Sequence, residues 1–166
     1  MIFPAIPQNA SVLVDANTLV YHFSLHPVLA SPCTELLNRV FRQELAGFTS
    51  ANVLSDVAHR LMALEVATVL GWTGPGITQR LRRHPAEIQK LTGFRQAVLE
   101  VPHFGVQVLP ITSALVENAT AVSQRFGLLS GDALIVAVMQ AQGLIHLASH
   151  DADFDRIPGL TRYAPI

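Results

Sequence analysis

Short apolar segments alternate with longer amphipathic ones along this chain, and that alternation is the feature that most limits its fold. The apolar segments are SVLVD (11–15), GFTS (47–50), VQVLPI (106–111) and LIHLAS (144–149). Each of the first three is followed by apolar residues at the three- and four-residue spacing typical of helices. Strands separated by helices usually lie side by side in the same direction. We therefore expect a mainly parallel sheet with helices on both faces.

The helical spacing predicts five principal helices. They are a short one within 18–24 and longer ones over 33–45, 50–70, 112–126 and about 131–142. Gly47, Gly71 and Gly127 are expected to end the helices that precede them, because glycine tolerates the left-handed conformation common at helix ends. In the second helix the apolar positions are Leu36, Leu37, Val40, Phe41 and Leu45.

The length of 166 residues suggests a single domain over 1–166. Half of the residues are hydrophobic and the mean hydropathy is +0.37, so we expect some apolar surface to be covered, for example in a homodimer.

The lone Cys33 excludes an internal disulfide, and the first ten residues lack the features of a secretory signal, which predicts a cytoplasmic protein. The longest apolar run, ALIVAVM (133–139), is too short to cross a membrane.

The aspartates are concentrated at positions where a parallel sheet would bring them together. Asp15 ends the first strand, and three aspartates follow the last strand within the stretch ASHDADFDRIPG (148–159). Asp132 begins a helix and Asp56 lies early in the long helix after the second strand. Carboxylates gathered in a partly buried cleft repel one another unless they hold protons or bind a cation. Oxygen ligands without paired Cys or His favour Mg²⁺ or Mn²⁺.

Each acid also has a structural explanation. Asp15 is explained as a turn residue at the end of a strand, and Asp132 as a first-turn acid that interacts favourably with the helix dipole. Asp56 and Arg60 have the spacing of an exposed ion pair on a helix. The aspartates after the last strand can cap a short helical turn. Only the combined pattern favours a functional site.

Four motifs carry a resemblance to a known family. VDANTLVY, TSANVLSDVAHRL, GLLSGDALIVAVMQAQG and LASHDADFDRIPGL resemble, in order, the four acidic motifs of the PIN-domain ribonucleases, in particular the VapC-like toxins of bacterial and archaeal toxin-antitoxin pairs. The resemblance spans about residues 11–163. It implies a PIN-like three-layer α/β/α sandwich around a mainly parallel sheet, here with a helical insertion near 71–105.

The resemblance also implies roles for individual residues. Four aspartates would be catalytic: Asp15, Asp56, Asp132 and Asp151. The metal ligands among them would be Asp15, Asp132 and Asp151, with supporting roles for Asn17, Ser149 and Asp153. The family usually has Glu where this chain has Asp56, whose side chain is one methylene shorter and reaches less far, so Asp56 is expected to bind through water or from a helix that lies closer.

The function implied by the resemblance is a Mg²⁺- or Mn²⁺-dependent endoribonuclease. A metal-bound water would attack an RNA phosphodiester, leaving a 5′-phosphate and a 3′-hydroxyl. The implied partners are an RNA substrate, with tRNA and rRNA as candidates, and a cognate antitoxin protein. Two alternatives remain: a non-catalytic PIN-like module that binds RNA or protein, and a phosphoacceptor receiver domain. The receiver needs a lysine late in the chain, whereas the only lysine here is Lys90.

The net charge of −1 gives the chain no overall attraction to RNA, so binding would depend on local patches or metal ions. Five of the eleven basic residues lie within the predicted insertion: Arg80, Arg82, Arg83, Lys90 and Arg95. They either contact RNA phosphates or form the solvated face of a surface helix. Trp72 either stacks on a base or anchors the insertion to the core. The seven histidines show no zinc-binding spacing.

Overall fold

A computed structural model describes all residues 1–166, and its centre is a sheet of five parallel strands. The strands are β1 (Ser11–Val14), β2 (Ala46–Ser50), β3 (Gln107–Leu109), β4 (His146–Ala148) and β5 (Thr161–Tyr163), in the order β3-β2-β1-β4-β5. Leu13 of β1 pairs with Phe48 of β2 on one side and with Leu147 of β4 on the other. The first strand is therefore central, and the strand expected to carry the acidic cluster is its direct neighbour.

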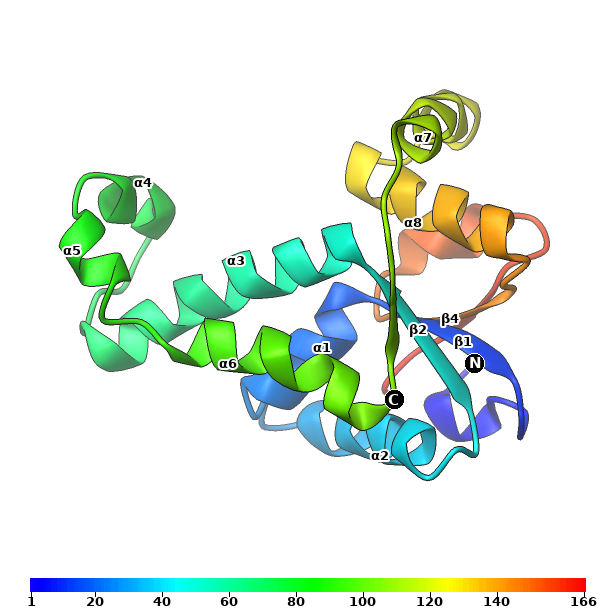
Figure 1. Cartoon of the computed structure of the whole chain (residues 1–166), viewed down its shortest axis with the longest axis horizontal. Helices are drawn as coiled ribbons and strands as arrows, with labels where there is room; N and C mark the ends of the chain where they lie inside the picture. The colour runs from blue at the N-terminus through cyan, green and yellow to red at the C-terminus, as the bar shows by residue number, and fades with distance from the viewer.

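Helices cover both faces of this sheet, as predicted, and give the three-layer α/β/α sandwich (Figure 1). On one side α1 (Ala16–Phe23), α2 (Ala30–Phe41), α3 (Ala51–Val69) and α6 (Gly93–Glu100) pack against one another. On the other side α7 (Ser113–Phe126) and α8 (Ser130–Gln142) form a tightly packed pair. Three short 3₁₀ turns complete the chain: Phe3–Ala5, Val101–Phe104 and Ala152–Arg156.

One hydrophobic cluster of 35 buried residues holds the layers together. Leu13 and Leu147 supply its centre from the sheet, and neither has any solvent exposure. In α8 the whole run from Ile135 to Met139 is buried, which explains why that segment is apolar on every face. Burying one such side chain contributes about 1.5–3 kcal/mol, so this cluster dominates the stability of the fold.

The helix predicted over 33–45 differs from the structure at its end. It ends at Phe41, and the chain turns through Gln43, whose φ is +60°, into β2. Phe41 is 65% exposed, so its helical spacing did not indicate burial. Gly47 lies within β2 and does not end the helix; a Cβ there would come within 2.6 Å of a methyl carbon of Val40. This glycine is required by the close approach of α2 to the strand.

The fifth strand was not predicted. It has only three residues, TRY, and follows the turn around Gly159, whose φ is +80°. So short a segment has no readable periodicity, and its strand character comes from pairing with β4. In contrast, Gly127 ends α7 in the left-handed conformation, as predicted.

The insertion near 71–105 begins as a helical extension and ends packed on the main core, to which α6 contributes Ala97. It contains α4 (Ile77–Arg82), α5 (Pro85–Ile88) and α6, and the first two lie at the end of α3 that is remote from the sheet (Figure 1). A second, small cluster of Val66, Leu81 and Leu91 supports them. Trp72 packs against this small cluster and not against the main core, so it supports the insertion from within.

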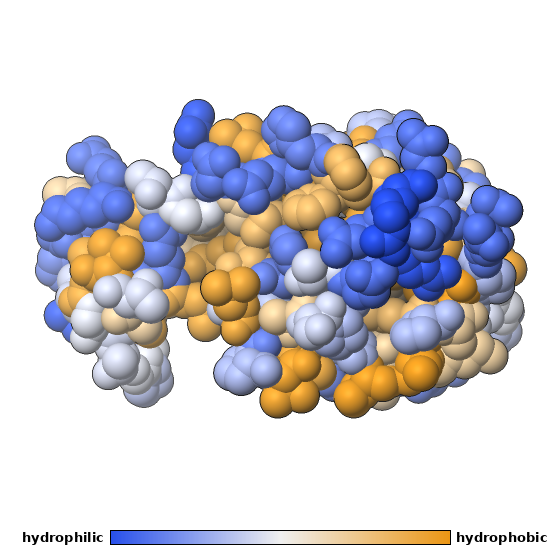
Figure 2. Space-filling view, turned by 90° about the horizontal axis from the view of Figure 1, so that it is seen from below, coloured by the Kyte–Doolittle hydropathy of each residue, from blue (hydrophilic) through white to orange (hydrophobic).

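No single helix has the length and hydrophobicity needed to cross a membrane; only α7 and α8 together would, and a bend of 112° separates them. Apolar side chains nevertheless remain on the surface. Leu25 and Leu129 are each more than three-quarters exposed, and Figure 2 shows hydrophobic residues interspersed with hydrophilic ones on one face.

Candidate active site

The site begins with Asp15, which directly follows the central strand. Its backbone N–H donates to the carbonyl of Ala148 at the end of β4, so the two strands are joined up to this point (3.0 Å). The side chain is 6% exposed and caps α1, with Oδ1 accepting from the N–H of Ala16 at 2.6 Å. Burial and capping therefore fix this carboxylate at the carboxyl edge of the sheet.

Asn17 and Ser149 hold the other oxygen of Asp15. Its Oδ2 accepts from Asn17 Nδ2 at 2.6 Å and from the Ser149 hydroxyl at 2.7 Å. Ser149 Oγ in turn accepts from Asn17 Nδ2 and from the backbone N–H of Asp151, both at 3.0 Å. Asn17 Oδ1 accepts from the N–H of His150 at 2.9 Å. This network links the ends of β1 and β4 and orients Asp15 and Asp151 together.

Asp132 lies in the first turn of α8, close enough to the other acids to feel their charge. Burial, and then the negative charges of Asp151, Asp15 and Asp153, raise the pKa of its carboxyl to about 6. Burial also raises the pKa of Asp15, with a smaller contribution from Asp151. The structure thus brings Asp15, Asp132 and Asp151 into one electrostatically coupled group.

The three aspartates after β4 have different surroundings. Asp151 caps the 3₁₀ turn Ala152–Arg156, since its Oδ1 accepts from the N–H of Asp153 at 2.9 Å. Asp153 forms an exposed ion pair with Arg156. Asp155 lies outside the group and binds Arg162 through two hydrogen bonds of 2.8 Å. The capping explanation therefore holds for Asp151, whose charge also acts on Asp132.

Asp56 is placed differently from the other candidate acids. It is exposed and lines a groove between α3, α7 and α8, with Asn52, Ser130 and Gly131 among its neighbours and a volume of about 470 Å³. Asp56 forms no ion pair with Arg60, so that explanation is wrong. The groove is flanked by the first turn of α8, which carries Asp132, so Asp56 lies at the border of the group.

Arg60 is a member of the site that the sequence argument missed. Its positive charge lowers the pKa of both Asp15 and Asp132, against the larger effect of burial. It lies one helical turn after Asp56 on α3, on the same face of the helix. The four-residue spacing of Asp56 and Arg60 suggested only an ion pair between them. It could also have indicated that Arg60 shares the helix face of Asp56 and therefore lies near the other acids.

The donor chemistry of this edge fits a hard divalent cation. The group offers carboxylate, amide and hydroxyl oxygens, and burial and the neighbouring carboxylates raise the pKa of Asp132 despite the charge of Arg60, so a cation would stabilise its charged form. No three His, Cys, Asp or Glu side chains are gathered closely enough to ligate a single ion. Mg²⁺ commonly keeps several waters and takes only one or two carboxylates, so an ion at this edge would be held by fewer than three of these side chains and otherwise by water.

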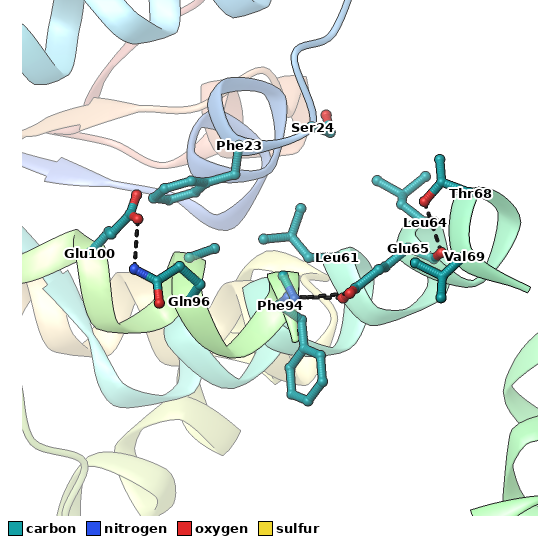
Figure 3. A pocket seen from close by; sticks show the side chains of 12 residues that line it. Phe23, Ser24, Leu61, Leu64, Glu65, Thr68, Val69, Phe94, Gln96 and Glu100 are labelled. Carbon is teal, nitrogen blue, oxygen red and sulfur yellow. Dashed lines mark hydrogen bonds between the residues drawn. The ribbon is translucent and has the colours of Figure 1, made fainter. Parts of the chain in front are cut away.

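A second groove, between α1, α3 and α6, lies apart from the acids. Its walls include Phe23, Leu61 and Phe94, and Figure 3 shows Glu65 reaching across it to the start of α6. The Glu65 carboxylate accepts from the N–H groups of Thr92, Gly93 and Phe94 at 2.8–3.0 Å. These bonds keep the pKa of Glu65 below its usual value despite the opposing effect of partial burial. The residue fixes α6 to α3.

Comparison with known proteins identifies the class. The PIN domain family matches residues 12–160, and the chain belongs to this family. No curated protein sequence matches it.

Solved structures with the same fold include a VapC toxin, a VapBC protein and FitAcB. VapC20 of Mycobacterium tuberculosis is 20% identical with a TM-score of 0.56, over 87% of this chain and 92% of that one. VapBC2 of Rickettsia felis is 17% identical with a TM-score of 0.53, over 93% and 98%. FitAcB of Neisseria gonorrhoeae is 18% identical with a TM-score of 0.52, over 93% and 97%. The chain therefore has the fold of VapC-like proteins over nearly its whole length.

Proposed function

We propose that this chain is a divalent-metal-dependent endoribonuclease of the cytoplasm and the toxin of a toxin-antitoxin pair. The observation that carries the proposal is the convergence of Asp15, Asp132 and Asp151 at the carboxyl edge, with the pKa of Asp132 raised to about 6. Carboxyl groups with perturbed pKa values that gather at the ends of parallel strands are typical of functional sites.

The proposed ligands are Asp15, Asp132 and Asp151, with Asp56 contributing from the border and Asp153 adjusting the local charge. Bound there, Mg²⁺ or Mn²⁺ would lower the pKa of an attacking water and offset charge on the scissile phosphate. Asn17 and Ser149 act through Asp15, since their hydrogen bonds hold Oδ2 in a single orientation. Arg60 adds a positive charge beside the acids, where it can attract the RNA phosphate.

The toxin assignment is supported by the nature of the structural neighbours. VapC20 is described as a toxin that cleaves the sarcin-ricin loop, and the structure from Klebsiella pneumoniae, 20% identical with a TM-score of 0.52, is a toxin-antitoxin complex. By analogy, RNA is the substrate here and a cognate antitoxin covers the site. The exposed Leu25 and Leu129 are available for an antitoxin or a homodimer contact.

The test is an RNA cleavage assay with Mg²⁺ or Mn²⁺, with and without chelator. Asp15→Asn is expected to reduce cleavage at least about 100-fold, because metal-assisted stabilisation is worth several kcal/mol. Asp155→Asn is the matched control, since it removes an aspartate of the same stretch that lies outside the group. Equal cleavage by the Asp15 variant and wild type would refute the assignment.

The alternative is a PIN-like module that binds RNA or protein without cleaving. Its support is Asp56, the shorter residue at the position where the family usually has Glu. Calorimetry with Mn²⁺ separates the two functions: a nuclease binds the ion with an affinity that Asp15→Asn lowers, whereas the module shows no carboxylate-dependent binding.

A further inference from the structure

Unpaired cations gather on one short segment of the insertion. Residues 71–105 contain five of the eleven Lys and Arg but only two of the twelve acidic residues. Elsewhere most arginines are neutralised: Arg39, Arg42, Arg156 and Arg162 each bridge to a carboxylate. By contrast, Arg80 and Arg82 on α4 and Arg83 directly after it are exposed and form no ion pair. These three arginines therefore carry positive charge that no carboxylate pairs with.

This charge is held in place by the small core of the insertion. The Arg80 guanidinium stacks on Trp72 at 3.8 Å from the ring centroid, and Trp72 itself packs against the cluster around Leu81. The hydrogen bonds that the Glu65 carboxylate accepts from the N–H groups at the start of α6 fix the far end of the same segment. The arginines of α4 thus project from a supported helix and not from a loose loop.

The arginines of α4 connect to the acidic edge along α3. Arg82 lines a small groove of about 130 Å³ together with His59 and Met62 of α3, so α4 lies beside the second half of that helix. Arg60, which follows His59 on α3, lowers the pKa of Asp15 and of Asp132 through its positive charge. In Figure 1, α3 runs from the sheet towards α4 and α5. These two helices lie on the same side of α3 as α7 and α8.

We infer that Arg60 on α3, Arg80 and Arg82 on α4, and Arg83 at the end of α4 form a basic track that binds the phosphates of an RNA strand leading away from the scissile bond. This inference rests on the proposed function and extends it. The track contacts backbone and not bases, so it supplies affinity and register without sequence preference. It also means that the substrate must extend beyond the nucleotides at the acidic edge.

The test uses the full chain with Asp15→Asn, which retains binding without cleavage, and a labelled oligouridine as probe. Its affinity is measured between about 50 and 200 mM KCl. Changing Arg82 and Arg83 together to Gln is expected to lower the slope of log Kd against log salt by about 1.4, or about 0.7 for each phosphate contact on a single strand. Arg80 is left unchanged in this variant so that its stacking on Trp72 is preserved.

Two further variants separate a local contact from general charge. Arg42→Gln with Arg125→Gln removes the same net charge outside the track and is expected to leave the slope unchanged. Arg82→Lys with Arg83→Lys keeps the positive charge and is expected to restore the slope. Unaltered thermal unfolding shows that each variant is folded.

An equal loss of slope in the Gln variant and its control, or no loss in either, would overturn the track. So would an unchanged RNA slope accompanied by weaker binding of a polyglutamate peptide, since the surface would then serve an acidic protein. The proposed function fails by a different observation, the absence of chelator-sensitive cleavage by the wild-type chain. The two failures are therefore distinguishable.

Discussion

The carboxyl edge of the sheet and the α4–α5 extension place charge in opposite ways. At the edge, Asp15 is 6% exposed and accepts three hydrogen bonds, two from residues that follow β1 and one from Ser149 after β4. In the extension, the arginines of α4 are exposed and rest on a cluster of only three buried residues, against 35 in the main core. Repelling acids need a strong scaffold because their charged forms are destabilised by burial, whereas solvated cations need only a supported helix.

The largest effect should come from removing a core side chain on each side of this comparison. Leu13→Ala is expected to destabilise the whole protein by about 3 kcal/mol, because the side chain is completely buried in the main cluster. Leu81→Ala should loosen chiefly α4 and α5, at about 2 kcal/mol. Hydrogen exchange separates the two: the Leu81 variant should lose protection in 77–92 while the strands keep theirs. Loss of protection in both regions would show that the extension is not independent.

The cost of gathering acids at the edge can be measured through Asp132. Since its folded-state pKa is about 6, above the unfolded value near 3.8, the folded state holds more protons between those values. Stability should therefore fall as pH rises from about 4 to 6 and stay lower above it. After allowance for solvent screening, Asp132→Asn should be more stable than wild type by about 1 kcal/mol at pH 7 without metal, and equal near pH 4. Urea unfolding at the two pH values checks this, and a variant less stable at pH 7 would contradict it.

The support of the extension can be tested at Glu65. Glu65→Gln should cost about 1 kcal/mol, as expected for loss of a charged acceptor at a helix start. Because the folded-state pKa of Glu65 is lowered, its stabilisation is present at neutral pH and lost as pH falls through that pKa. Faster amide exchange at Thr92, Gly93 and Phe94 is the local readout, with Glu117→Gln on α7 as a control of equal charge. Unchanged exchange at these amides would show that α6 is held by packing alone.

The smallest expected effect concerns the border of the site. Asp56→Glu lengthens the side chain by about 1.5 Å, towards the reach usual in the family. A few-fold rise in kcat/KM at limiting Mn²⁺ is expected if Asp56 now acts through water. Asp56→Asn serves as the comparison and should lower the same constant. A fall on substitution by Glu would indicate that the shorter residue is matched to this groove.

Much of the architecture could be predicted from the residues alone. The short β-branched run that ends at Asp15, the helix ending at Gly127 and the aspartates beyond β4 depend on local periodicity and turn chemistry, which the sequence displays directly. Gly47 and Phe41 show the limit of this method. Helical spacing placed Phe41 on a buried face, but α2 presents it to solvent. Gly47 was expected to end a helix, but the close methyl groups of Val40 are the reason that this position has no side chain.

The sequence by itself determined that acids would follow the strands and that basic residues would fill the insertion, because these are properties of the order of residues. Tertiary structure alone decided which of those acids act on one another. It joined Asp15 to Ser149 across 134 positions, paired Asp155 with Arg162 outside the group, and brought Arg60 beside the acids. Electrostatic interaction depends on the distance between charges and on their burial. Sequence separation gives neither quantity, because both are set only when the strands pair in the folded protein.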